Sequence, residues 1–156
     1  VLREHDYLFI AMLASSSNRL KALLGLMKGA KIMNVIIVGG GKTGAYLASV
    51  LIKNGCAVKV LESRKNVFEK VRMELPAEVL VHGNGSDPTV LEKAGISAAD
   101  VMVADTGKDE INLVVSTISK FEFGVPKVIA RVNNPKNAWM FGPGMGVVEP
   151  GFVVEV

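Results

Sequence analysis

The chain has 156 residues, of which 49% are hydrophobic, and it carries a formal net charge of +3. This length allows one domain with a substantial core, and the hydrophobic fraction argues against intrinsic disorder. A single cysteine, Cys56, excludes an intrachain disulfide framework and suits a reducing compartment. The excess of basic residues lies in residues 1–33, and no basic stripe with interleaved aromatic residues follows. Nucleic-acid binding is therefore not expected.

The N-terminal segment predicts a strand and a helix that precede the main pattern. Residues 7–14 are apolar, and Leu20, Leu23, Leu24 and Met27 share one helical face. The apolar run is too short to span a membrane, and no signal peptide is evident. We expect a strand–helix extension over residues 1–32, a nucleotide-binding domain over 33–150 and a tail over 151–156. The extension could also be the end of a preceding domain.

The main pattern starts with a buried strand, a glycine-rich turn and a helix. A strand is predicted over 34–38, and residues 35–38 are apolar and β-branched, which is typical of a strand buried on both faces. The turn fits G-x-G-x-x-G at Gly39, Gly41 and Gly44, and an apolar helical pattern over 42–54 follows. In this context the motif indicates dinucleotide binding, with the phosphates at the helix N-terminus beside Lys42 and Thr43. A P-loop does not fit, because its first glycine would fall at Ile36.

The second strand, over 57–61, ends in a carboxylate at the position this motif requires. Glu62 lies 21 residues after Gly41 and is followed by Ser63. A carboxylate there accepts hydrogen bonds from a ribose 2′-OH and repels a 2′-phosphate. The sequence therefore favours NAD(H) or an adenine nucleotide over NADP.

The remaining elements alternate regularly. A helix is predicted over 64–74 and a strand over 78–82, and Asp87 caps a short helix that begins at Pro88. A strand over 100–104, a long helix over 109–123, a strand over 127–132, a short helix after Asn134 and a sixth strand at 147–148 complete the chain. This alternation predicts an α/β fold: a Rossmann-like, doubly wound, mainly parallel six-stranded sheet with helices on both faces.

Ligands bind such sheets at the carboxyl ends of the strands, where the topology reverses. The glycine turn, Glu62, the loop Gly83–Ser86, and Asp105 with Thr106 should therefore surround one crevice. The helix over 109–123 has an apolar stripe that either covers the sheet or contributes to a dimer. Its members are Ile111, Val114, Val115, Ile118 and Phe121.

Several motifs in order resemble the regulatory nucleotide-binding domain of potassium transporters and channels, known as the TrkA N-terminal (KTN) or RCK N-terminal domain. The resemblance covers about residues 33–150. It rests on the glycine turn and Glu62, on Gly83-Asn84-Gly85-Ser86-Asp87-Pro88, on Asp109-Glu110-Ile111-Asn112 and on Ile129-Ala130-Arg131. The last two motifs are not shared by generic Rossmann dehydrogenases.

The resemblance implies a ligand set, partners and residue roles. Such domains bind NAD(H), ATP or ADP, assemble as dimers or rings, and pass the ligand state to a membrane K⁺ transporter or channel from its cytoplasmic side. Gly39, Gly41 and Gly44 would carry the phosphates and Glu62 the ribose. Asn84, between Gly83 and Gly85, would lie beside the adenine, Thr106 beside Asp105 would line the cleft, and Arg131 would face the phosphates or a neighbouring subunit.

Two departures from the family pattern concern the ligand. The family usually has Gly-Asp where this chain has Gly83-Asn84, and it often has arginine at the position of Lys42. Lysine keeps the charge but lacks the planar fork, so weaker phosphate contacts are expected.

Two other function classes remain open. One is a small NAD-dependent oxidoreductase, although the short-chain Tyr-x-x-x-Lys pair is absent, His5 and His82 are isolated, and no Cys/His cluster indicates a metal. The other is an oligomerisation module that binds no nucleotide. We expect a regulatory, non-enzymatic domain.

Overall fold

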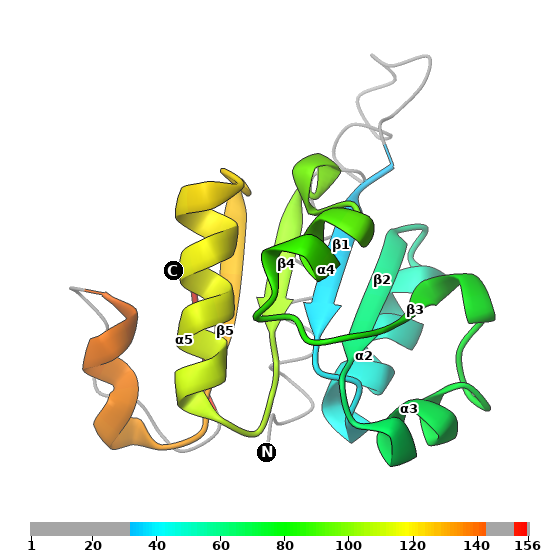
Figure 1. Cartoon of the computed structure of the whole chain (residues 1–156), viewed down its shortest axis with the longest axis horizontal. Helices are drawn as coiled ribbons and strands as arrows, with labels where there is room; N and C mark the ends of the chain where they lie inside the picture. The colour runs from blue at the N-terminus through cyan, green and yellow to red at the C-terminus, as the bar shows by residue number, and fades with distance from the viewer. Residues whose placement is uncertain (1–31, 143–151, 156) are drawn as a thin grey trace.

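The computed structural model describes residues 32–142 and 152–155 and contains a sheet covered by helices on both faces (Figure 1). The predicted N-terminal strand and helix, and the predicted strand at 147–148, lie outside these residues. The strands are β1 (Asn34–Val38), β2 (Ala57–Glu62), β3 (Leu80–His82), β4 (Val101–Ala104), β5 (Lys127–Val132) and β6 (Phe152–Glu155). The α-helices are α2 (Lys42–Lys53), α3 (Lys65–Val71), α4 (Pro88–Lys93) and α5 (Asp109–Thr117). Short helical turns are η1 (Ala77–Val79), η2 (Ile96–Ala98), η3 (Ile118–Glu122) and η4 (Pro135–Phe141).

The strand order in the sheet is β3-β2-β1-β4-β5-β6. The first five strands are parallel, with Val35 of β1 paired to Val58 of β2 on one side and to Val101 of β4 on the other. This is the doubly wound arrangement that the alternating pattern predicted, and that prediction is confirmed. The strand order reverses between β1 and β4, which is the place where open α/β sheets usually bind a ligand, at the carboxyl ends of the strands.

The sixth strand completes the sheet in the opposite direction. β6 pairs antiparallel with β5, and Arg131 lies opposite Val153. The sequence analysis had assigned residues 151–156 to a tail, whereas the structure places 152–155 in the sheet.

Alternation along the central strands divides the core between the two faces. Val35 and Ile37 of β1 pack with residues of α2 such as Leu47, whereas Ile36 and Val38 pack in a cluster that includes Leu91 of α4. Both faces of β1 are therefore buried, which is why its sequence is apolar from Val35 to Val38. The part of the chain that the structure describes contains no helix with the length and hydropathy of a membrane span.

The predicted apolar stripe of the long helix is partly wrong. The residues buried against the sheet are Asn112, Val115, Ser116 and Ser119, whereas Phe121 is 79% exposed. The buried face keeps helical spacing but lies one position after the predicted stripe, because it includes polar residues that an apolar pattern passes over. α5 ends at Thr117 and continues as the π-helical turn η3. Figure 1 shows this continuous helical segment packed over β4 and β5.

Two other boundaries also differ from the prediction. α3 ends at Val71 rather than at residue 74. The strand expected over 78–82 begins only at Leu80, because Pro76 starts the turn η1, in which the Val79 N–H donates to the Pro76 carbonyl at 3.0 Å. β3 is consequently a short edge strand.

Candidate functional site

A cavity of about 560 Å³ opens at the carboxyl ends of the central strands. It lies where the strand order reverses, which is the usual ligand position in open α/β sheets. Its walls come from the loops after β1, β2, β3 and β4 and from the start of α5. The lining residues are Val38, Gly39, Leu61, Glu62, Ser63, Arg64, Gly83, Asn84, Gly85, Thr106, Gly107, Lys108 and Ile111.

Backbone hydrogen bonds that continue the sheet ladder hold these loops together. The Gly39 N–H donates to the Leu61 carbonyl at 2.9 Å, and the Gly83 N–H donates to the Glu62 carbonyl at 3.1 Å. Gly39 has a φ of +118°, and a Cβ atom there would lie 2.4 Å from the Asp105 carbonyl oxygen. The first glycine of the motif thus allows the β1 and β4 loops to touch.

Glu62 is the buried carboxylate of the cavity. Its side chain is only 2% exposed and forms an ion pair with Arg64. Oε2 accepts hydrogen bonds from the Gly40 N–H and from Arg64 Nη2, both at 2.9 Å. Oε1 accepts from the Arg64 N–H at 2.8 Å and from Arg64 Nε at 2.9 Å. Burial alone would raise the pKa of Glu62, but these hydrogen bonds outweigh it and hold the pKa below its ordinary value.

The N-terminus of α2 follows the glycine turn beside this carboxylate. Gly41 is the N-cap, no side chain caps the helix, and its first turn contains no acidic residue. The first N–H groups therefore keep their capacity to bind an anion. Lys42 is exposed at the first helical position, and the predicted site residues Gly41, Lys42 and Thr43 all lie outside the cavity lining.

Gly44 has a packing role. A Cβ atom at this position would lie 1.9 Å from the Gly39 carbonyl oxygen. The third glycine of the motif therefore brings α2 close to the end of β1 and does not line the cavity.

The loop after β3 places Asn84 at the opposite wall. Asn84 Oδ1 accepts a hydrogen bond from the Ser86 N–H at 3.0 Å, a turn that an aspartate in this place could also form. Asp87 caps α4 through the Thr89 N–H at 2.8 Å, as its position before Pro88 predicted. Gly83 and Gly85 pack against valine side chains. A Cβ atom added at Gly83 would lie 2.7 Å from the Val90 side chain, and one added at Gly85 would lie 2.3 Å from the Val38 side chain.

Asn112 holds the loop after β4 in place. Its side-chain amide donates to the carbonyls of Thr106 at 3.0 Å and of Arg131 at 2.8 Å. Its Oδ1 accepts from the Thr106 N–H at 2.9 Å and from Thr106 Oγ1 at 2.6 Å. Asn112 is fully buried, and every donor and acceptor site of its amide is used.

Asp109 extends this polar network to η4. Its carboxylate accepts hydrogen bonds from the backbone N–H groups of Asn133 at 2.6 Å and Asn134 at 2.9 Å. It also accepts from the Asn137 side chain at 2.8 Å. Burial would raise the pKa of Asp109, but the hydrogen bonds from Asn133, Asn137 and Asn134 lower it. The acidic pair at the start of α5 thus includes one structural carboxylate.

Asp105 and Arg131 lie outside the cavity lining and pair with each other. Arg131 Nη1 is 3.3 Å from Asp105 Oδ1, and the two side chains are 17% and 1% exposed. Asp105 Oδ2 and Arg131 Nε have no hydrogen-bond partner among the described residues. Burial raises the pKa of Asp105 to about 7, although the Arg131 charge acts against this rise.

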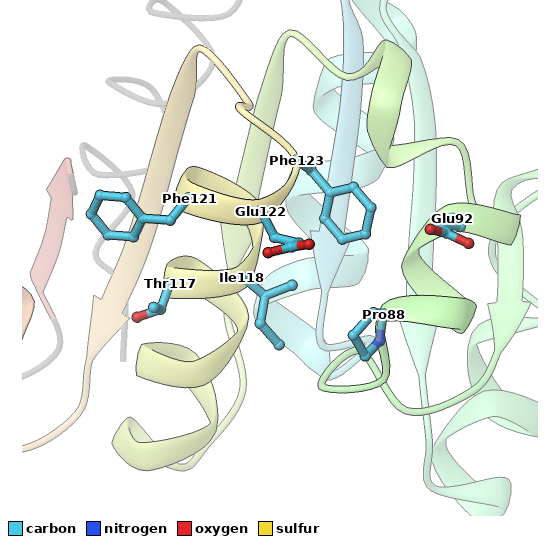
Figure 2. Close-up of a pocket in the computed structure, with 7 residues that line it drawn as sticks. All are labelled: Pro88, Glu92, Thr117, Ile118, Phe121, Glu122 and Phe123. Carbon is cyan, nitrogen blue, oxygen red and sulfur yellow. The ribbon is translucent and has the colours of Figure 1, made fainter.

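A second cavity, of about 520 Å³, lies between α4 and the η3 turn (Figure 2). Figure 2 shows Ile118 and Phe123 facing Pro88 across this hollow, with Phe121 pointing away. Its charged lining residues are Glu92 and Glu122, so its charge disfavours a phosphate. None of the predicted nucleotide-binding residues lines it.

The structure thus gathers seven of the predicted site residues around the first cavity and places the others behind it or beside it. The seven are Gly39, Glu62, Ser63, Gly83, Asn84, Gly85 and Thr106. The sequence analysis missed Arg64 and Lys108, two cations of the lining. Arg64 could have been found, because it follows Glu62 by two residues at the end of a strand. Over the described residues, no cluster of His, Cys, Asp and Glu is placed to hold a metal ion.

Sequence comparison connects the chain with one family. The sequence profile of the TrkA-N domain matches residues 35–148. A Trk system potassium uptake protein TrkA homolog of Methanothermobacter thermautotrophicus is 46% identical over 109 residues, which is 70% of this chain and 50% of that protein. The chain spans about half the length of the curated relatives that it matches first.

Structural comparison supports the same fold. The structure of GsuK bound to ADP superposes with a TM-score of 0.65 at 16% identity, over 87% of this chain and 31% of that one. The GsuK channel bound to NAD gives a TM-score of 0.61 at 19% identity, over 71% and 19% of the two chains.

Proposed function

The chain belongs to the TrkA-N domain family, and from this membership we propose that it is a nucleotide-binding regulatory domain of potassium transport. The observation that carries the proposal is the cavity at the β1–β4 switch point. Gly39 and the buried carboxylate of Glu62 line this cavity, and the uncapped N-terminus of α2 begins two residues after Gly39, directly after the Gly40 N–H that Glu62 binds. This pairing matches the two ends of an adenosine phosphate, because the helix suits phosphates and the carboxylate suits a ribose.

The ligands of this proposal are NAD(H) or ATP/ADP. The cavity volume falls within the range usual for small-molecule sites. Arg64 and Lys108 in the lining, with Lys42 at the start of α2, supply positive charge for phosphates. The structural neighbours bound to ADP and to NAD support both ligand classes. Among the described residues, the lining contains no histidine or cysteine, which favours binding over catalysis.

The partners of this proposal follow from the relatives. A relative named as a potassium uptake protein supports association with a membrane K⁺ transporter or channel. We place the domain at the cytoplasmic face of that partner, as a dimer or larger ring of identical chains. Nucleotide binding would draw the loops after β1 and β3 together across the cavity. The difference in nucleotide affinity between the domain with these loops apart and the domain with them together would then shift the conformational equilibrium of the partner transporter or channel.

The first test is calorimetric titration of the full chain with NADH, NAD⁺, ATP and ADP, with Gly41→Asp as the disabling variant. Aspartate is a favoured N-cap residue, so helix α2 should keep its stability. A Cβ atom at Gly41 has only Arg64 Nη2 within 4 Å, at 3.9 Å, so the side chain fits. The added charge at the N-terminus of α2 should weaken nucleotide binding by at least about tenfold.

Gly41→Asn is the matched control, because asparagine caps equally well and has the same shape without the charge. We expect its affinity to lie closer to that of the wild type than to that of Gly41→Asp. Absence of saturable binding by the wild type would contradict the proposal and favour an oligomerisation module. Oxidation of bound NADH coupled to reduction of a carbonyl substrate would favour the oxidoreductase alternative.

A further inference from the structure

Glu62 has no acceptor capacity left for a ligand. A carboxylate offers about four lone-pair positions, and four hydrogen bonds from Gly40 and Arg64 occupy them. A ribose 2′-OH that approached this carboxylate would find no free lone pair. One of the four hydrogen bonds must therefore break before Glu62 can hold a ribose.

The guanidinium of Arg64 is the group that can leave. The Gly40 and Arg64 N–H donors belong to the backbone of the tight loops around Glu62, and a Cβ atom on Gly40 would lie 3.0 Å from Glu62 Cβ. The Arg64 side chain is 59% exposed, in contrast to the 2% exposure of Glu62. Its displacement moves one solvated side chain and leaves the loops unchanged.

The same guanidinium offers donors to a different ligand group. Arginine has five N–H donors, and the fork on Glu62 engages only Nε and one N–H of Nη2. Arg64 is a lining residue of the cavity, and its remaining donors are not used by Glu62. A phosphate on the ribose 2′-oxygen can accept hydrogen bonds from these unused Arg64 donors while the Arg64–Glu62 ion pair remains intact. The ion pair also offsets the repulsion that a lone Glu62 carboxylate would exert on this phosphate.

We propose that Arg64 sets the selectivity of the site between 2′-hydroxyl and 2′-phosphate nucleotides, by competing with the first and binding the second. This inference rests on the proposed nucleotide-binding function. The Arg64 side chain would reduce the preference for NAD(H) over NADP(H) that the Glu62 carboxylate alone would impose. Arg64 is a specificity residue, and it must leave Glu62 each time a 2′-hydroxyl ligand binds there.

The test is calorimetric titration of the full chain with NADH and NADPH, which differ only in the 2′-phosphate. Arg64→Met removes every donor at similar length, and Arg64→Lys keeps the charge without the fork. We expect Arg64→Met to bind NADH more tightly than the wild type and NADPH more weakly. The ratio of the two dissociation constants should change by at least about tenfold. Arg64→Lys should fall between the wild type and Arg64→Met.

Lys70→Gln is the charge control, because Lys70 is exposed on α3 and outside the cavity lining. The ratio of the NADH and NADPH dissociation constants of Lys70→Gln should equal the wild-type ratio. A purely structural role for Arg64 predicts that Arg64→Met weakens both ligands equally, and this result would overturn the inference alone. Failure of every variant and of the wild type to bind either ligand would overturn both the inference and the proposed function.

Discussion

Replacement of Gly44 by alanine is expected to destabilise the domain by more than about 3 kcal/mol, because it forces two backbone segments apart. The added Cβ would lie 1.9 Å from the Gly39 carbonyl oxygen and 3.4 Å from Ile37 Cγ2. The carbonyl belongs to the turn between β1 and α2, so no side-chain rotation relieves the contact. The measurement is the free energy of unfolding from urea denaturation of the wild type and the variant.

Gly107→Ala is the matched control for this experiment. Gly107 also lies in a loop of the cavity, but a Cβ atom there has nothing within 4 Å. Its free energy of unfolding should stay within about 0.5 kcal/mol of the wild-type value. Equal stability of Gly44→Ala and Gly107→Ala would contradict the close packing of α2 on β1. The expected instability also explains why Gly41, and not Gly44, is the position for testing ligand binding.

Asp105 is expected to make the domain less stable as the pH rises towards neutrality. Burial raises the folded-state pKa to about 7 from an ordinary value of 3.8. Between these values the folded state binds the proton more tightly than the unfolded state does, so stability is highest at the acidic end and falls with rising pH. From about pH 5 to about pH 8 the loss should approach roughly 3 kcal/mol.

The measurement is the free energy of unfolding across this pH range for the wild type and for Asp105→Asn, which cannot titrate. The variant should lose the pH-dependent fall. Asp87→Asn is the control, because asparagine also caps a helix and Asp87 is exposed. The lowered pKa values of Glu62 and Asp109 produce the opposite trend at more acidic pH, where stability falls as these groups are protonated. A wild-type fall that Asp105→Asn retains would contradict the prediction.

The sequence predicted the sheet and the floor of the cavity because local signals agree there. The apolar run of β1, the glycine spacing and the carboxylate at the end of β2 each demand the same strand–turn–helix unit. The parallel order then follows from the alternation of strands and helices. Gly39 and Glu62 were therefore assigned to the cavity without any knowledge of distant contacts.

The features that escaped prediction depend on non-local packing. Asp105 and Arg131 are 26 residues apart, and only the β4–β5 pairing brings them together. The buried face of α5 and η3 contains the polar residues Asn112, Ser116 and Ser119, so a stripe read from apolar residues alone was displaced and included the exposed Phe121. The ion pair of Arg64 with Glu62 is local, yet a sequence pattern gives residue types and spacing but not side-chain conformation.

The polar network around Asn112 has a mechanical consequence. One amide ties Thr106 in the cavity wall to the backbone of Arg131 in β5, and Asp109, on the same helix, binds the backbone N–H of Asn134 at the start of η4. These hydrogen bonds are at least partly shielded from solvent, so we expect the loop after β4, the start of α5 and β5 to move together. If a ligand binds in the cavity as proposed, its contacts with the loop after β4 would also act on β5 and, through the β5–β6 pairing, on the far edge of the sheet.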